Sequence, residues 1–379
     1  IYRNMDQDQK SIETFKKVVA DYPSTPEANE AIAFSRLVYA KINRLDEYVE
    51  WVETIGFADI KRASLVSTMY NTGFDYYSAN NCTEAISAFN NYLKKFPDGL
   101  FFVQANYFLG ECAYKAKKDD VAAPALERVI NEPRSEYTER SISMLASIYY
   151  AGQDFTKALF YYEQLLSFSE EMAQLRNARL GAMRCAVKLD IPNKALQFAD
   201  IILDDERTEP EVKSEAMLVQ ARSYWKLEDV DRAHEAYNNV KLQTKGESQA
   251  EAAYFISKIQ NMRAEYEQSN TTIFWMIDNL PSYQKWRFQA LLVLADNYYK
   301  TGDNFQANYT LDFIISENYN AEIVTAAKAM KEEIRRAEEQ KDEMQKRRDD
   351  ELNEQIIEIN GNAPDEFEEE TEGEIKNKN

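Results

Sequence analysis

The most constraining feature of this sequence is a repeat of about 37 residues that runs through most of its 379 residues. Each repeat carries one residue at an equivalent place, which we call the anchor, and eight of the nine anchors are Ala or Ser. Consecutive anchors are 36 to 38 residues apart. The anchors are Ser11, Tyr48, Ala85, Ala122, Ala158, Ala195, Ala233, Ser269 and Ala307. So steady a period indicates an array of similar units that stack on their neighbours.

Each repeat is predicted to contain two helices. Mostly apolar residues follow the anchor at four and seven positions, as in Ala85, Phe89 and Tyr92, and so form one stripe on an α-helix. A second apolar helical segment precedes each anchor, and a short polar turn such as Gly152-Gln153-Asp154 separates the two. We call the segment before the anchor the first helix and the segment that carries it the second helix.

The composition favours helices over sheets. The chain has only 10 Gly and 9 Pro, which are too few for the many tight turns of a β-sandwich or barrel. The predicted array covers residues 1–320, as about eight helix pairs after an N-terminal half repeat, and we expect it to continue upstream. A long helix is predicted over 321–359, first capping the array and then almost wholly charged from Arg335. Residues 360–379 are predicted to be a disordered acidic tail.

The repeat resembles the tetratricopeptide repeat over roughly residues 8–320. That family has Leu-Gly and an aromatic in the first helix, Ala and an aromatic in the second, and a closing Pro. The best-matching units are Gly73/Tyr76/Ala85/Phe89/Pro97, Leu109/Gly110/Ala122/Leu126, Leu145/Tyr149/Ala158/Tyr162 and Leu294/Tyr298/Gly302/Ala307. The pattern departs at Tyr48, at Ala199 and in the first helix of the Ser269 unit. The resemblance implies a right-handed superhelical solenoid whose first helices line a concave groove.

Two short motifs carry a narrower resemblance. Asp21-Tyr22-Pro23-Ser24 and Lys95-Phe96-Pro97-Asp98, the latter followed by an Ala-x-Tyr-x-Leu-Gly-Glu stretch, look like tetratricopeptide proteins of the bacterial cell envelope. These include the Tol-Pal-associated coordinator of cell-wall synthesis and the BamD-type outer-membrane lipoproteins. This resemblance implies a periplasmic or outer-membrane-associated location, and a cytoplasmic one is the alternative.

Catalytic chemistry is not indicated. No phosphate-binding loop, dinucleotide fingerprint, nucleophile elbow or zinc-protease motif occurs, and the single histidine, His234, has no partner of its kind. We therefore expect no catalytic residue, no metal site and no cofactor. Cys82, Cys112 and Cys185 are expected to form no disulfide framework, with Cys112 and Cys185 as small core residues and Cys82 in a turn.

The partner is expected to be a protein or peptide. A net charge of −20 argues against nucleic acid and anionic membranes, and no apolar run is long enough to span a bilayer. By the resemblance, the groove positions of the first helices hold a column of aromatic residues that we predict to bind the partner. They are Tyr70, Tyr77, Tyr107, Tyr114, Tyr150, Trp225, Tyr254 and Tyr299. The alternative is that these rings only pack within the chain.

Three functions remain open on the sequence. The first is a non-catalytic interaction scaffold of the bacterial cell envelope. The second is a cytoplasmic assembly or regulatory adaptor with the same architecture. The third is an accessory domain of a larger protein whose activity lies upstream.

Overall fold

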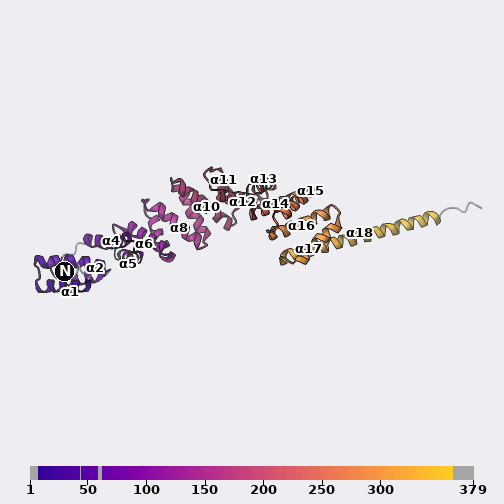
Figure 1. The fold of residues 1–379 in the computed structure, drawn as a ribbon. Helices are drawn as coiled ribbons and strands as arrows, with labels where there is room; N and C mark the ends of the chain where they lie inside the picture. Colours follow the sequence, from indigo (N-terminus) through magenta and orange to yellow (C-terminus); the bar gives the residue numbers. More distant parts are fainter. Residues whose placement is uncertain (1–6, 43, 59–61, 362–379) are drawn as a thin grey trace, which may run out of the picture. The chain divides into compact units, whose positions relative to one another are not determined.

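The computed structural model describes residues 7–42, 44–58 and 62–361, and every regular element in these ranges is an α-helix (Figure 1). The all-α prediction is therefore confirmed. The chain divides into two compact units, Ile1–Asp229 and Val230–Asn379.

In the first unit consecutive helices from α4 to α12 pack on one another, as do α1, α2 and α3, and α4 packs on α2. The second helices α5, α7, α9 and α11 thus lie between consecutive first helices. The first helices of neighbouring repeats also touch one another directly, as α4 and α6 do. The helices of this unit are α1 (Asp8–Asp21), α2 (Pro26–Lys41), α3 (Leu45–Glu53), α4 (Arg62–Ser78), α5 (Cys82–Lys95), α6 (Phe102–Lys115), α7 (Asp119–Ile130), α8 (Thr138–Ala151), α9 (Phe155–Phe168), α10 (Met172–Lys188), α11 (Pro192–Asp204) and α12 (Pro210–Lys226).

The second unit repeats this packing. The first helices α14 and α16 are adjacent, and α18 packs on both α16 and α17. Its helices are α13 (Val230–Gln243), α14 (Glu247–Met262), α15 (Tyr266–Asn279), α16 (Gln284–Lys300), α17 (Asn304–Glu317) and α18 (Ala321–Gly361). The start of α18 buries Ile323, Ala327 and Ile334, whereas its side chains from Glu338 to Gln355 are exposed. Of the predicted acidic tail, residues 360 and 361 belong to α18, and 362–379 lie outside the described residues.

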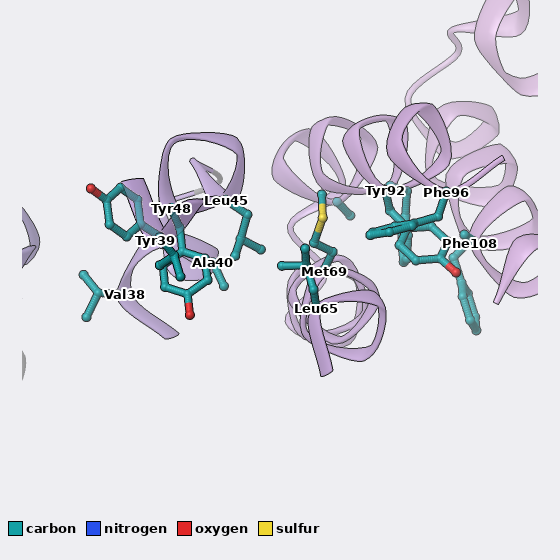
Figure 2. Packing of buried hydrophobic residues seen from close by; sticks show 14 of the residues in the cluster. Val38, Tyr39, Ala40, Leu45, Tyr48, Leu65, Met69, Tyr92, Phe96 and Phe108 are labelled. Carbon is teal, nitrogen blue, oxygen red and sulfur yellow. The ribbon is translucent and has the colours of Figure 1, made fainter. Parts of the chain in front are cut away.

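The anchors lie on the odd-numbered helices, and all nine are buried. Small anchors let the paired helices approach closely, and the residues four and seven places later fill the core between them. In α5 this stripe is Ala85, Phe89 and Tyr92, all fully buried. Figure 2 shows Tyr92 beside Phe96, whose ring centroids are 5.6 Å apart, with Phe108 of the next first helix nearby.

In the seven helix pairs from α4–α5 to α16–α17, one residue of the turn adopts a left-handed backbone conformation. In these pairs it lies five positions before the anchor, with φ between 55° and 85°. These residues are Asn80, Lys117, Gln153, Asp190, Glu228, Ala264 and Gly302. In three turns the next residue, Asn81, Asp154 or Asp303, caps the second helix through its side chain. A left-handed conformation costs a residue with a Cβ atom about 1–2 kcal/mol, and only the last of these turns uses glycine.

The turn at Ala264 is therefore a site for stabilisation. Ala264 has φ 60° and no side-chain polar atom that could support the conformation. We expect Ala264→Gly to raise the free energy of unfolding by about 0.5–1 kcal/mol, after the larger backbone entropy of glycine in the unfolded chain is subtracted. Chemical denaturation measures this change. As the control, Ala326→Gly on the exposed face of α18 is expected to lower stability by about 1 kcal/mol. A loss of stability in Ala264→Gly contradicts the prediction.

The structure corrects the cysteine prediction. Cys82 and Cys112 form a disulfide, with a Cα–Cα distance of 5.0 Å across 30 residues of sequence. Cys82 begins the second helix α5, and Cys112 lies in the following first helix α6, which packs against α5. The prediction was wrong because the spacing of cysteines along the chain does not reveal which helices are neighbours. Cys185 is a free and fully buried thiol, as expected of a core residue.

Candidate functional site

An aromatic surface is formed by two adjacent first helices of the first unit. We define it as Tyr70, Phe74 and Tyr77 on α4 together with Phe108, Glu111 and Tyr114 on α6. The three rings of α4 are three or four residues apart, so that they share one helix face. Phe108 joins the two helices, since its ring centroid lies 4.5 Å from that of Tyr77 and 5.3 Å from that of Phe74. Tyr70 also stacks on Phe101, just before α6, at 4.2 Å.

A hydrogen-bonded polar group borders these rings. The Tyr77 hydroxyl donates to Glu111 at 2.9 Å, and Lys115 forms an ion pair with the same carboxylate at 2.8 Å. Burial and the Glu111 hydrogen bond raise the pKa of Tyr77 to about 12. Burial opposes ionisation of Glu111, but the hydrogen bonds from Lys115 and Tyr77 outweigh it and lower the pKa of that carboxyl. At neutral pH Glu111 is therefore ionised, and its carboxylate interacts with two donors, the Tyr77 hydroxyl and the Lys115 ammonium group.

The predicted groove residues differ in what they can offer a partner. Tyr114 is 37% exposed, and Tyr70 and Tyr77 are half-buried. Tyr107 is only 3% exposed, because its ring packs on Tyr137 with centroids 4.6 Å apart. Its hydroxyl interacts with Arg140, and burial, opposed by Arg140, raises the pKa of this tyrosine. Tyr107 therefore supports the aromatic surface through its buried ring, which packs on Phe108, and is too buried to contact a partner directly.

The other predicted residues lie further along the first helices. Tyr150, near the end of α8, is half-buried and meets Phe155 and Tyr162 edge-on, at 5.6 and 6.5 Å. Trp225 is half-buried near the end of α12. Tyr254 and Tyr299 belong to the second unit. The eight residues are therefore distributed over two units and are considered unit by unit.

The second unit has an open groove of about 410 Å³ between the first helices α14 and α16 and the start of α18. Tyr254, Leu292 and Met330 supply its apolar lining, one from each helix. On the polar side, the Asn261 amide donates to Asp296 at 2.7 Å. The C-terminal helix forms one wall of this groove.

The sequence did not single out Phe74 as a binding residue, although it is 39% exposed at the centre of the aromatic surface. Its place on the groove-facing side of α4, between Tyr70 and Tyr77, was the available signal. Gln289 was also missed. Its Oε1 atom is buried at the groove of the second unit without a hydrogen-bond partner. No local pattern distinguishes such an oxygen.

The described residues offer few other candidates for metal binding or acid–base chemistry. In the described ranges, no group of three or more His, Cys, Asp or Glu side chains could hold a metal ion. Within the same ranges no helix has the length and apolar character needed to cross a membrane. His234 is half-buried, and burial together with Arg263 lowers the pKa of its imidazole.

Comparisons with known protein families find tetratricopeptide repeats in parts of the sequence. Models of the tetratricopeptide repeat match residues 1–25, 70–136 and 139–171. Among curated proteins, no relative of this sequence is found.

Several solved structures are similar at low identity. The C-terminal part of a tetratricopeptide protein from Cytophaga hutchinsonii is 13% identical, with a TM-score of 0.46, covering 68% of this chain and 98% of its own. A tetratricopeptide protein from Parabacteroides merdae is 15% identical, with a TM-score of 0.35, covering 69% and 97%. YrrB, described as a tetratricopeptide protein with an unusual peptide-binding site, is 15% identical, with a TM-score of 0.40, covering 55% and 100%. The sequence matches show tetratricopeptide repeats within residues 1–25, 70–136 and 139–171, and the described helices outside these ranges have the same paired arrangement with buried anchors.

Proposed function

We propose that this chain is a non-catalytic interaction scaffold of the bacterial cell envelope, and that it binds a partner protein or peptide on the face of its first helices. The aromatic surface on α4 and α6 carries the proposal. Exposed Phe74 and Tyr114 supply apolar area, and Tyr77 is already oriented by Glu111. Large aromatic side chains that are partly ordered before binding lose little entropy on association and dominate the binding energy of interfaces.

The border of this surface suits a peptide or protein better than a small molecule. Glu111, Lys115 and Arg140 offer charged groups beside the rings, the last through its contact with Tyr107. An apolar centre with a polar rim is the usual arrangement at protein interfaces. The groove of the second unit has the same mixture, with Tyr254 and Leu292 beside Lys258 and Asp296.

Two observations support the envelope location. One is the resemblance of the segments at Asp21 and Lys95 to envelope tetratricopeptide proteins. The other is the Cys82–Cys112 disulfide, since disulfides persist in oxidising compartments such as the periplasm and are rare in the cytosol. The disulfide favours the envelope scaffold over a cytoplasmic adaptor.

Photocrosslinking in native cells tests the binding surface. A photoreactive phenylalanine replaces Phe74 or Tyr114, and the matched control replaces Phe160, a 54% exposed aromatic on the second helix α9. We expect one partner to crosslink from positions 74 and 114 but not from 160. Against that partner, Phe74→Ala is expected to weaken binding at least tenfold, about 1.4 kcal/mol, with Phe160→Ala nearly unchanged. Equal labelling from all three positions, or none, refutes the surface.

The compartment is tested separately. In the full-length gene product, a reporter enzyme that is active only after export is fused to the end of this chain. Activity of the reporter supports the envelope scaffold. A fusion protein that is produced at full length but has no reporter activity rejects that location, and leaves the adaptor and accessory-domain functions.

A further inference from the structure

An exposed row of aromatic side chains runs along α17, the second helix of the repeat that precedes α18. Phe305, Tyr309 and Phe313 are four residues apart, so that they share one face of the helix. The opposite face carries Leu311 and Ile314, which are fully buried in the core. Phe305 and Tyr309 are 76% and 68% exposed, and Phe313 is exposed as well. We call these three aromatic residues the outer stripe.

The outer stripe has no counterpart in the other repeats. Its residues lie two positions before, two after and six after the anchor. In α5 these positions hold Thr83, Ser87 and Asn91, and in α13 they hold Asp231, Glu235 and Asn239. No other repeat has more than one apolar residue at the three positions. The repeat architecture therefore does not require aromatic side chains here, since a second helix whose outer face meets only solvent is polar on that face.

The exposed apolar area is large enough for an interface. Tyr319, just after α17, is also exposed and stacks on the buried ring of Phe288 with centroids 5.1 Å apart, and Phe313 stacks on the same ring at 6.3 Å. Two of the four exposed rings are thus held in place before any partner binds. A free aromatic side chain presents about 200 Å², so the exposed fractions of the four leave about 450 Å² open. That is more than half of the roughly 800 Å² that each partner of a specific interface buries.

The order of residues in the outer stripe fits a second copy of this chain. Tyr309 is the centre of the stripe, and a phenylalanine lies four residues away on either side. When a second α17 packs antiparallel across a two-fold axis at Tyr309, each Phe305 meets Phe313 of the other copy, and the two Tyr309 side chains meet each other. A two-fold contact needs a patch that is complementary to itself, and the outer stripe has this property.

The charges beside the outer stripe agree with this occupant. Asp312, which precedes the last residue of the stripe, forms an ion pair with Lys331 of α18, so that two copies bring no unpaired like charges together there. The adjoining surface of α18 alternates in sign, with Lys328, Glu332 and Arg335 about one turn apart. A border of mixed charge does not favour a strongly charged partner.

We propose that this chain forms a homodimer through the outer stripe, with the two α17 helices antiparallel and the two-fold axis at Tyr309. The contact buries the three aromatic rings of both copies, and Tyr319 lies at its edge. No residue of the aromatic surface on α4 and α6 takes part. The dimer therefore does not depend on the proposed binding surface, and either can fail alone.

Sedimentation velocity over a range of protein concentrations tests the dimer. We expect the unaltered chain to dimerise in the micromolar range, and Phe305→Ser/Tyr309→Ser to weaken the association about a hundredfold, because rings at the centre of an interface supply most of its binding energy. Both replaced side chains are exposed, and thermal unfolding confirms that the variant is folded. Phe160→Ser is the matched control, since Phe160 is an exposed aromatic at the repeat position of Tyr309, and it should leave the association unchanged. A chain that stays monomeric up to about 1 mM, or a double variant that dimerises as strongly as the unaltered chain, overturns the proposal.

Single cysteines test the register of the two helices. With a rise of 1.5 Å per residue, position 305 lies about 12 Å along the helix axis from position 305 of the second copy, whereas position 309 faces itself. Under mild oxidation we expect Tyr309→Cys to form a disulfide-linked dimer, and Phe305→Cys to form one only when it is mixed with Phe313→Cys. The natural cysteines do not interfere, because two are bonded to each other and the third is buried. Absence of a crosslink at position 309, or a crosslink of position 305 with itself, overturns the antiparallel register.

A lipid surface is the other occupant to be tested, since exposed aromatic rings also insert into membrane interfaces. The probe is a vesicle of phosphatidylcholine, which carries no net charge. We expect no binding of the unaltered chain to these vesicles. Binding that is lost in Phe305→Ser/Tyr309→Ser, by a chain that is monomeric in solution, assigns the outer stripe to a membrane and overturns the dimer.

Discussion

Loss of the Cys82–Cys112 disulfide is expected to lower the free energy of unfolding by about 3–4 kcal/mol. The bond joins residues 30 apart in sequence and so restricts a long loop of the unfolded chain. The chain-entropy model gives this magnitude for a loop of that length. The loss should appear in the double variant Cys82→Ser/Cys112→Ala, because Cys112 is fully buried and alanine fits its place. Denaturation with and without reductant measures it.

The reductant supplies the control. It should destabilise the natural sequence to the level of the double variant and leave the double variant unchanged. Under denaturing conditions without reductant, one thiol, that of Cys185, should react with an alkylating reagent. Three reactive thiols would disprove the disulfide, and would also remove one support for the envelope location.

The second large effect is expected from Gly110→Ala, at about 2–3 kcal/mol of lost stability. A Cβ atom at Gly110 would lie 2.6 Å from Cγ and 2.7 Å from Cδ2 of Leu126. Leu126 is fully buried on the paired helix α7 and cannot move aside without disturbing its neighbours. Overpacking of this kind typically costs about 1–3 kcal/mol, and outweighs the better helix propensity of alanine.

Gly56→Ala is the matched control, because a Cβ atom there meets no heavy atom within 4 Å. It is expected to change stability by less than about 0.5 kcal/mol. The midpoint of chemical denaturation compares the two variants. A change in Gly110→Ala no larger than in Gly56→Ala would mean that α6 and α7 do not approach as closely as the structure has them.

The sequence predicted on which helices the residues of the candidate site lie, but not which of their side chains are exposed. The groove positions of the first helices pointed to α4, α6 and α14, where Tyr77 is half-buried, Tyr114 is exposed and Tyr254 lines the groove of the second unit. The same positions gave no information on exposure. Tyr107 is covered by Tyr137, from the segment just before α8, whereas Phe74 is left exposed. Whether a ring is covered is decided by a neighbouring repeat, and no local pattern records it.

The sequence by itself determined the period, the pairing of helices within each repeat and the residues that face the core. These follow from local rules, since a stripe at 3.6-residue spacing and a small anchor act within one helix and its partner. Only the tertiary structure decided that Cys82 meets Cys112 and that the Tyr77 hydroxyl donates to Glu111, 34 residues away in the sequence. Such contacts between residues of different helices depend on how neighbouring repeats stack. Stacking is a property of the packed core as a whole, and the spacing of residues along the chain does not specify it.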